Sequence, residues 1–239
     1  MIRTLALHTL RECLRRPFPY ILAVVVGLIA LASHLFQAFS FGAGDLEAAN
    51  LGISAVFLAG LAYAALQGTA LIRVDLERGT LGLLLAQPVG LPTYLAGRLL
   101  GLVTASLLVC ALVAVQVTVI FLLPAGRGNA AALRGTELFA GWGRALLPVI
   151  ILDAAALAAS ALTSRALGPV VLLGLFVAGT LAGDSGLGLL LPDFSLFGLE
   201  AGAKPAWGLL MVYTCLYTSV LALVAYLALA ARAPLRSRG

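Results

Sequence analysis

Six long apolar runs fill most of this 239-residue chain and restrict what it can fold into. A helix needs about 20 apolar residues to cross the hydrocarbon core of a bilayer, and each run is near or above that length. Charged residues make up only 10% of the chain, whereas a typical soluble domain has about 25%. We therefore predict an all-α membrane protein with spans at residues 18–39, 51–72, 94–123, 146–162, 167–191 and 207–231.

Two of these runs depart from a simple crossing. The fourth is the shortest, and the apolar residues before it predict a helix that extends back towards Leu138. The fifth contains Gly179, Gly183, Gly186 and Gly188, so we expect its last third to be broken or re-entrant. Irregular backbone at that depth requires a protein-lined or wet site.

The first sixteen residues are too polar for a span, and their pattern predicts an amphipathic helix. At about 100° per residue, the apolar residues gather on one half of the helix. Arg11, Arg15 and Arg16 fall on the other half. A basic amphipathic helix of this kind lies along a membrane surface. Pro17 and Pro19 are expected to end it before the first span.

Basic residues are spread unevenly over the segments between the spans. With the N-terminus inside, the inner segments hold eleven arginines, and the outer ones hold three arginines and one lysine. Positive charge is enriched on the cytoplasmic side of membrane proteins. We therefore expect both termini to be cytoplasmic, with an interfacial helix at residues 1–16 and a six-span transmembrane domain at residues 17–239.

A charged segment between the second and third runs is the most distinctive part of the chain. Residues 73–101 read RVDLERGTLGLLLAQPVGLPTYLAGRLLG. Thr80 is suited to cap a short leucine-rich helix that Pro88 ends. A free loop gains nothing from four leucines, so we favour a structured element that contacts a soluble partner. Its candidate contacts are Asp75, Glu77, Arg78, Gly79 and Thr80.

This segment resembles the cytoplasmic coupling loop of ABC-2 type transporter permeases. The family loop typically reads E-x-G-T-L-x-x-L-L-x-x-P, followed by Gly-Lys or Gly-Arg in the next span. Here the loop spans residues 73–92 and the later pair is Gly97-Arg98. Gly82 stands where the family often carries an acid. The amphipathic start and the compact aromatic turn LPDFSLFGL before the last span are also similar to the family.

The resemblance implies a permease subunit of a bacterial inner-membrane exporter. It implies a second copy of this permease, or a homologous one, and two copies of a separate ATP-binding subunit. By this analogy, residues 73–92 would couple nucleotide-driven closure to movement of the spans. The transport path would lie between the two permeases, and nothing in the sequence identifies the substrate.

Apart from Asp184, in the last third of the fifth run that we expect to be broken, Asp153 is the only acidic residue inside a predicted span. An intramembrane carboxylate is costly and usually faces a protein interior or a water-filled cavity. Asp153 is therefore a candidate for the translocation path. The alternatives are a position nearer the outer interface, or a structural hydrogen bond to a polar neighbour such as Gln116, Gln67 or His34.

Two pairs of glycines match the small-residue motif with which membrane helices pack closely. They are Gly97-x-x-x-Gly101 and Gly179-x-x-x-Gly183. A chain with 26 glycines produces such pairs easily by chance, so the motif alone decides little.

Several motifs that would indicate other functions are missing from the sequence. The chain has no phosphate loop, no H-E-x-x-H and no G-x-S-x-G, so we predict no catalytic site of its own. ATP hydrolysis is assigned to the partner subunit. No Cys/His cluster has metal-ligand spacing, and no cofactor is expected. The arginines are not interleaved with aromatic residues, which argues against nucleic-acid binding.

Three other functions would each require a sequence pattern of their own. A haem-exporter permease of cytochrome c maturation shares the size, the span count and a similar loop, but the chain offers little of the Trp and His pattern expected for haem. An ATP-independent secondary transporter would show inverted repeats and several buried ionisable groups. An integral membrane enzyme would need the catalytic residues that are missing.

Overall fold

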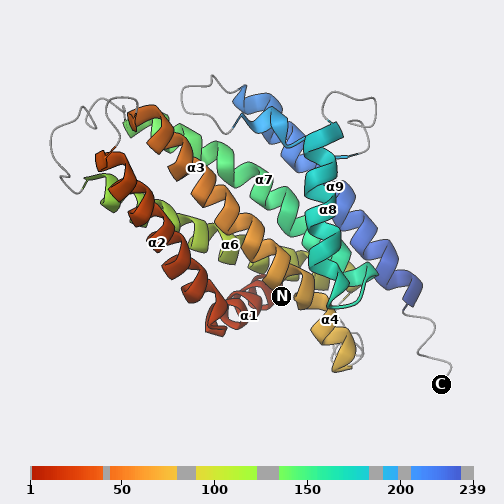
Figure 1. The fold of residues 1–239 in the computed structure, drawn as a ribbon. Helices are drawn as coiled ribbons and strands as arrows, with labels where there is room; N and C mark the ends of the chain where they lie inside the picture. Colours follow the sequence, from red (N-terminus) through yellow and green to blue (C-terminus); the bar gives the residue numbers. More distant parts are fainter. Residues whose placement is uncertain are drawn as a thin grey trace.

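The computed structural model describes residues 2–39, 44–79, 90–122, 135–182, 191–198 and 206–232. All regular elements in these ranges are helices (Figure 1). Four of them are long and apolar enough to cross a membrane, namely Asn50–Glu77, Leu91–Val119, Phe139–Leu162 and Trp207–Arg232. The described residues are thus all-helical, with four helices suited to cross a membrane, which confirms the all-α part of the prediction.

The N-terminal segment forms α1 (Ile2–Arg15), followed by α2 (Phe18–Phe39). The chain bends at Arg16 and Pro17, so Pro17 ends the first helix as predicted. Pro19 does not break a helix. It lies in the first turn of α2, where a backbone N–H would have no partner within the helix.

The second apolar run forms one long helix with a local irregularity. It consists of α3 (Gly44–Tyr63), a π-helical turn η1 (Ala64–Gly68) and α4 (Thr69–Glu77). In the π turn, the Thr69 N–H bonds the carbonyl of Ala64. The helix ends at Arg78 and Gly79, and Gly79 has φ +71°, a left-handed conformation that favours glycine.

The remaining helices follow the apolar runs closely. They are α6 (Leu91–Leu122), α7 (Gly135–Leu162), α8 (Leu167–Ala182), the short 3-10 turn η4 (Ser195–Phe197) and α9 (Trp207–Arg232). The predicted backward extension of the fourth helix is confirmed, because α7 begins at Gly135. Gly183, Gly186 and Gly188 lie outside the described residues, and so does the predicted break in the fifth run.

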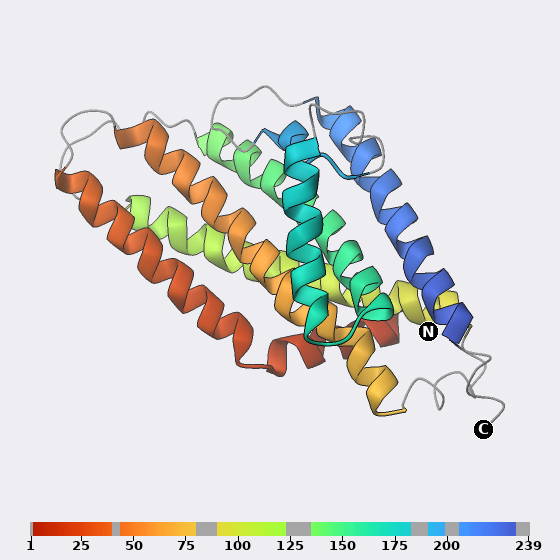
Figure 2. The same cartoon turned by 45° about the vertical axis from the view of Figure 1, so that its right-hand side comes forward.

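The helix α7 forms the centre of the bundle. It packs against α3, α4, α6, α8 and α9, and the two views agree on this central position (Figures 1 and 2). In the apolar 18-residue window within Phe139–Leu162, 83% of the residues are buried, against 17% in the corresponding window within Trp207–Arg232 of α9. Small buried alanines from Ala154 to Ala161 let neighbouring helices approach α7.

Residues 191–198 form a compact turn at the end of the bundle opposite α1 (Figure 2). The Phe194 ring packs on Phe176 of α8 with 5.2 Å between centroids. A Cβ on Gly179 would lie only 2.3 Å from the Pro192 carbonyl oxygen, so this approach requires glycine. Asp193 closes the turn by accepting a 2.8 Å hydrogen bond from the Ser195 N–H.

Candidate functional site

The helix α1 lies across the first turns of α6, and two glycines permit the close contact. A Cβ on Gly97 would lie 2.7 Å from the Cβ of Leu5. A Cβ on Gly101 would lie 2.7 Å from the Ala6 carbonyl oxygen and 2.5 Å from the Cβ of Thr9. Gly97-x-x-x-Gly101 is therefore a packing motif, and it receives the N-terminal helix.

Arg98 lies between these glycines and links three elements. Its side chain is only 6% exposed. One guanidinium nitrogen donates to Asp75 of α4, and another donates to Glu12 of α1 over 2.9 Å. The second nitrogen also lies 3.3 Å from the Thr9 hydroxyl, and the Tyr94 hydroxyl donates to Asp75. Arg98 thus joins the ends of α1, α4 and α6 by hydrogen bonds and ion pairs.

Arg16 extends this network to the π turn of the second span. Its guanidinium donates to the side-chain oxygen of Gln67 over 3.0 Å and to Glu12 over 3.1 Å. π turns are rare and occur frequently at functional sites. We call Glu12, Arg16, Gln67, Asp75 and Arg98 the junction network.

The charges of the junction network balance, with two arginines against two carboxylates. Burial raises the pKa of Glu12, but the hydrogen bonds and charges of Arg98 and Arg16 lower it by more, so the pKa lies below its ordinary value. Cys13, beside Glu12 on α1, is 1% exposed, and burial raises the pKa of its thiol. Cys13 is therefore expected to react slowly while α1 is docked.

The predicted coupling residues separate into exposed and buried groups. Glu77 is 48% exposed at the end of α4, where it accepts a 3.0 Å hydrogen bond from Arg73. Arg78 follows it and is exposed. The sequence groups Asp75 with these surface contacts, but the structure turns it inward, 7% exposed, towards Arg98.

The remaining part of the predicted coupling loop is not covered by the structure. Thr80, the leucine run and Pro88 lie outside the described residues. The predicted helix cap and the predicted short helix therefore remain predictions.

The orientation of α1 differs in detail from the amphipathic pattern. Arg11 and Arg15 are exposed, as expected for an interfacial helix, whereas Arg16 points to the π turn. Thr9 and Glu12 belong to the polar half, yet both contact Arg98 of α6. The polar residues reach Arg98 because α1 packs against α6 along one edge of its apolar half. The rest of that half, including Ile2 and Leu7, is exposed.

Asp153 lies deep in the bundle and is 0% exposed. Its Oδ2 is 2.5 Å from the Ser106 hydroxyl oxygen, which in turn lies 3.0 Å from the carbonyl of Val103. A serine hydroxyl has a single hydrogen to donate. The Ser106 hydroxyl donates to Asp153, so the Oδ2 atom of this buried carboxyl has a hydrogen-bond partner.

The structural hydrogen bond considered as an alternative for Asp153 is present. Its partner is Ser106, whereas Gln67 binds Arg16 and the side chain of His34 is not described. Within the described residues, no three His, Cys, Asp or Glu side chains are grouped to hold a metal ion.

The contacts of Arg98 with Asp75 and Glu12 were not predicted from the sequence. A signal was available, since an arginine within an apolar run needs a partner. The acids closest to the same membrane surface are Glu12 and Asp75. Ser106 carried no comparable signal, because serine is common in membrane helices.

Comparison with known proteins adds no family assignment. No protein-family model matches the sequence, and no curated protein matches it either. The described residues therefore define only a class, a helical bundle with four helices long and apolar enough to cross a membrane and with α1 bound by a charged network.

Proposed function

We propose that this chain is the permease subunit of an ABC-2 type transporter in a bacterial inner membrane. One observation carries the proposal. The segment that resembles a coupling loop begins within α4, and Asp75 and Arg98 bind the end of α4 to α6. A force on the exposed Glu77–Arg78 end is thereby transmitted to a span and, through Glu12, to the interfacial helix.

The proposed topology has six spans. The four long helices provide four of the spans, and the other two are α2, with 22 residues, and α8, with 16 residues. At 1.5 Å per residue these two measure about 33 Å and about 24 Å, so α8 requires a thinner bilayer, snorkelling flanking residues or further residues to cross. An even number of spans places both termini on one side. The excess of arginine there makes that side cytoplasmic.

The arrangement of the helix ends supports this topology. The helix α1, the end of α4 and the end of α9 all lie at the same end of the bundle (Figures 1 and 2). An ATP-binding subunit on that side would meet Glu77 and Arg78 directly and would reach Asp75 only through α4. Two such subunits and a second permease copy complete the proposed transporter. The path lies between the permeases, and Asp153 acts on it through the packing of α6 against α7.

Site-specific photocrosslinking tests the proposal. A photoreactive phenylalanine analogue replaces Arg78, and the host's own crosslinked partners are identified by mass spectrometry. We expect an ATP-binding protein that carries a phosphate loop and the ABC signature. The same probe at Leu216, which is 57% exposed on α9, is the matched control and should capture no such protein. Reaction of a membrane-impermeant thiol label with an Arg78→Cys variant from outside the cell would refute both the topology and the assignment.

A further inference from the structure

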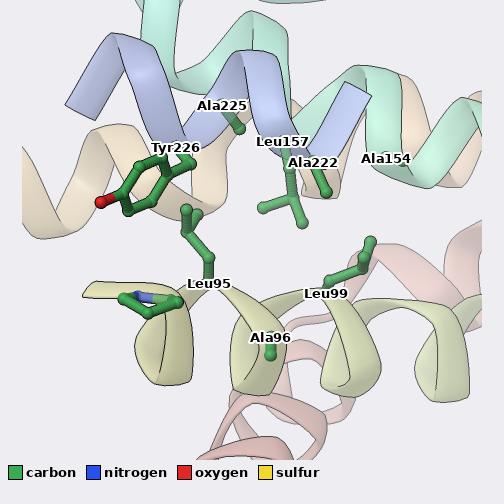
Figure 3. Close-up of a pocket in the computed structure, with 9 residues that line it drawn as sticks. Leu95, Ala96, Leu99, Ala154, Leu157, Ala222, Ala225 and Tyr226 are labelled. Carbon is green, nitrogen blue, oxygen red and sulfur yellow. The ribbon is translucent and has the colours of Figure 1, made fainter. Parts of the chain in front are cut away.

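A groove of about 220 Å³ opens between α6, α7 and α9 (Figure 3). Leu95 and Leu99 of α6 form one wall, and Ala222, Ala225 and Tyr226 of α9 face them across the groove, with Leu157 of α7 behind. The lining side chains are hydrocarbon except for the hydroxyl of Tyr226.

The groove is short enough to lie within one membrane leaflet. Pro92, the second residue of α6, lines the end near the start of α6, and Leu99 lines the end further along the helix. Seven residues of helix separate them, about 10 Å at 1.5 Å per residue. The hydrocarbon layer of a single leaflet is about 15 Å thick. The groove is therefore within reach of the acyl chains of the leaflet next to α1.

Water is a poor occupant of this groove. A buried water needs two to four polar partners, and the lining offers one hydroxyl. Apolar cavities of about 150 Å³ stay dry and take up hydrocarbons such as benzene. A groove of this size and lining that faces lipid is therefore filled by hydrocarbon.

The size of the groove suits a single chain. Its volume of about 220 Å³ lies along about 10 Å of helix length, and a helix about 10–12 Å wide would need far more space over the same length. Carbon atoms in contact lie about 4 Å apart, so one extended acyl chain fits.

A cation stands where the headgroup of such a lipid would lie. Arg232 is six residues beyond Tyr226 on α9, at the membrane-surface end of the helix. It donates a 2.9 Å hydrogen bond to the carbonyl of Leu162, which holds the guanidinium between the ends of α7 and α9. Arginine offers five N–H donors, and it binds phosphate oxygens in pairs.

We propose that this groove and Arg232 form a binding site for one anionic phospholipid. The acyl chain fills the groove and the phosphate binds Arg232. Such a lipid completes the packing of α9, the least buried of the four long apolar helices. The proposal requires only that the chain lies in a membrane, and it stands or falls independently of the permease assignment.

Native mass spectrometry of the full chain in mild detergent tests this site. Phosphatidylglycerol and phosphatidylcholine with identical acyl chains are the probes. We expect one phosphatidylglycerol to bind in preference to phosphatidylcholine. Arg232→Gln should lower the phosphatidylglycerol affinity about fivefold, the effect of one basic residue at a membrane surface, and should leave phosphatidylcholine unchanged.

Two further variants test the groove itself. Ala222→Leu fills it from α9 and Ala96→Leu fills it from α6, so each should weaken binding of both lipids. Ala231→Leu, at an exposed position on α9 outside the groove, is the matched control and should bind as the parent does. Equal binding of the two lipids by the parent would overturn the headgroup assignment. Undiminished binding by both groove variants would overturn the acyl-chain site.

Discussion

Arg98 and Asp75 form a buried ion pair between α6 and α4, although 23 residues separate them in the chain. Their side chains are 6% and 10% exposed. Asp75 precedes the exposed Glu77 by two residues, so the pair lies directly behind the proposed docking surface. Any displacement of the end of α4 must either move α6 or break this pair.

Arg98→Gln is expected to be the most damaging single change in the junction network. It leaves Asp75 buried without its cation and removes the bond to Glu12. Loss of one partner of a buried ion pair costs about 3–5 kcal/mol. Thermal unfolding of the detergent-purified chain measures the loss. Arg11→Gln, on the exposed side of α1, is the control. Equal melting temperatures for the two variants would show that the pair does not stabilise the fold.

Gly101→Ala should push α1 away from α6. The added methyl group meets the Ala6 carbonyl oxygen and Thr9, and overpacking of this kind costs about 1–3 kcal/mol. The sensitive readout is Cys13, which should react faster with a maleimide once α1 lifts. The exposed Cys215 is first replaced by serine to remove the background.

Gly174→Ala is the matched control for this change. Gly174 lies in α8, and a Cβ there would meet nothing within 4 Å. Alanine is favoured over glycine in a helix by about 0.5–1 kcal/mol, so this variant should be slightly more stable and Cys13 should stay protected. If both glycine variants expose Cys13 equally, the close contact at Gly101 does not hold α1 against α6.

The stability of the α1 contact should depend on pH through Glu12. The pKa of Glu12 is lower in the folded chain than its ordinary value of 4.5. The ionised carboxylate therefore stabilises the fold fully above 4.5, and this contribution is lost as the pH falls through the lower folded pKa. Melting temperatures measured from pH 7 downward should fall at acid pH by less in Glu12→Gln than in the parent. Parallel curves for the two proteins would contradict the linkage.

The exposed pair Glu77 and Arg78 should matter for partner binding and little for folding. Replacing both with glutamine removes their charges at surface positions, where such changes usually alter stability by about 0.5 kcal/mol or less. We expect unchanged membrane insertion and melting, with a reduced yield of the ATP-binding subunit on co-purification. Arg11→Gln together with Arg15→Gln, also exposed, controls for loss of surface charge. Full transport and full co-purification by the Glu77/Arg78 variant would remove the docking assignment.

The helices themselves were predictable from the sequence because each apolar run is long enough to need a bilayer. The predicted limits of the first run, Phe18 and Phe39, are those of α2. The π turn at Ala64–Gly68 was not predictable, since one extra residue leaves no trace in a largely apolar run. The inward orientation of Asp75 goes with its contact to Arg98, 23 residues away, which no local pattern records.

The contacts of α1 were only partly predictable. Its amphipathic pattern predicted a helix with Arg11 and Arg15 on the polar half, and both are exposed on α1. The pattern could not show that α1 packs closely against Gly97 and Gly101 of α6, because glycine pairs are frequent in this chain. Glu12 and Arg98 lie 86 residues apart, and only the folded bundle brings them together.

Asp153→Asn should be tolerated, whereas Asp153→Ala should destabilise the bundle. The asparagine amide keeps an oxygen that accepts the hydrogen bond from Ser106, so we expect a change of about 1 kcal/mol or less. Alanine removes the acceptor and leaves a void at a 0% exposed position, at a cost of about 2–4 kcal/mol. Thermal unfolding distinguishes the two outcomes. If asparagine is as damaging as alanine, the hydrogen bond from Ser106 does not account for the contribution of Asp153 to stability.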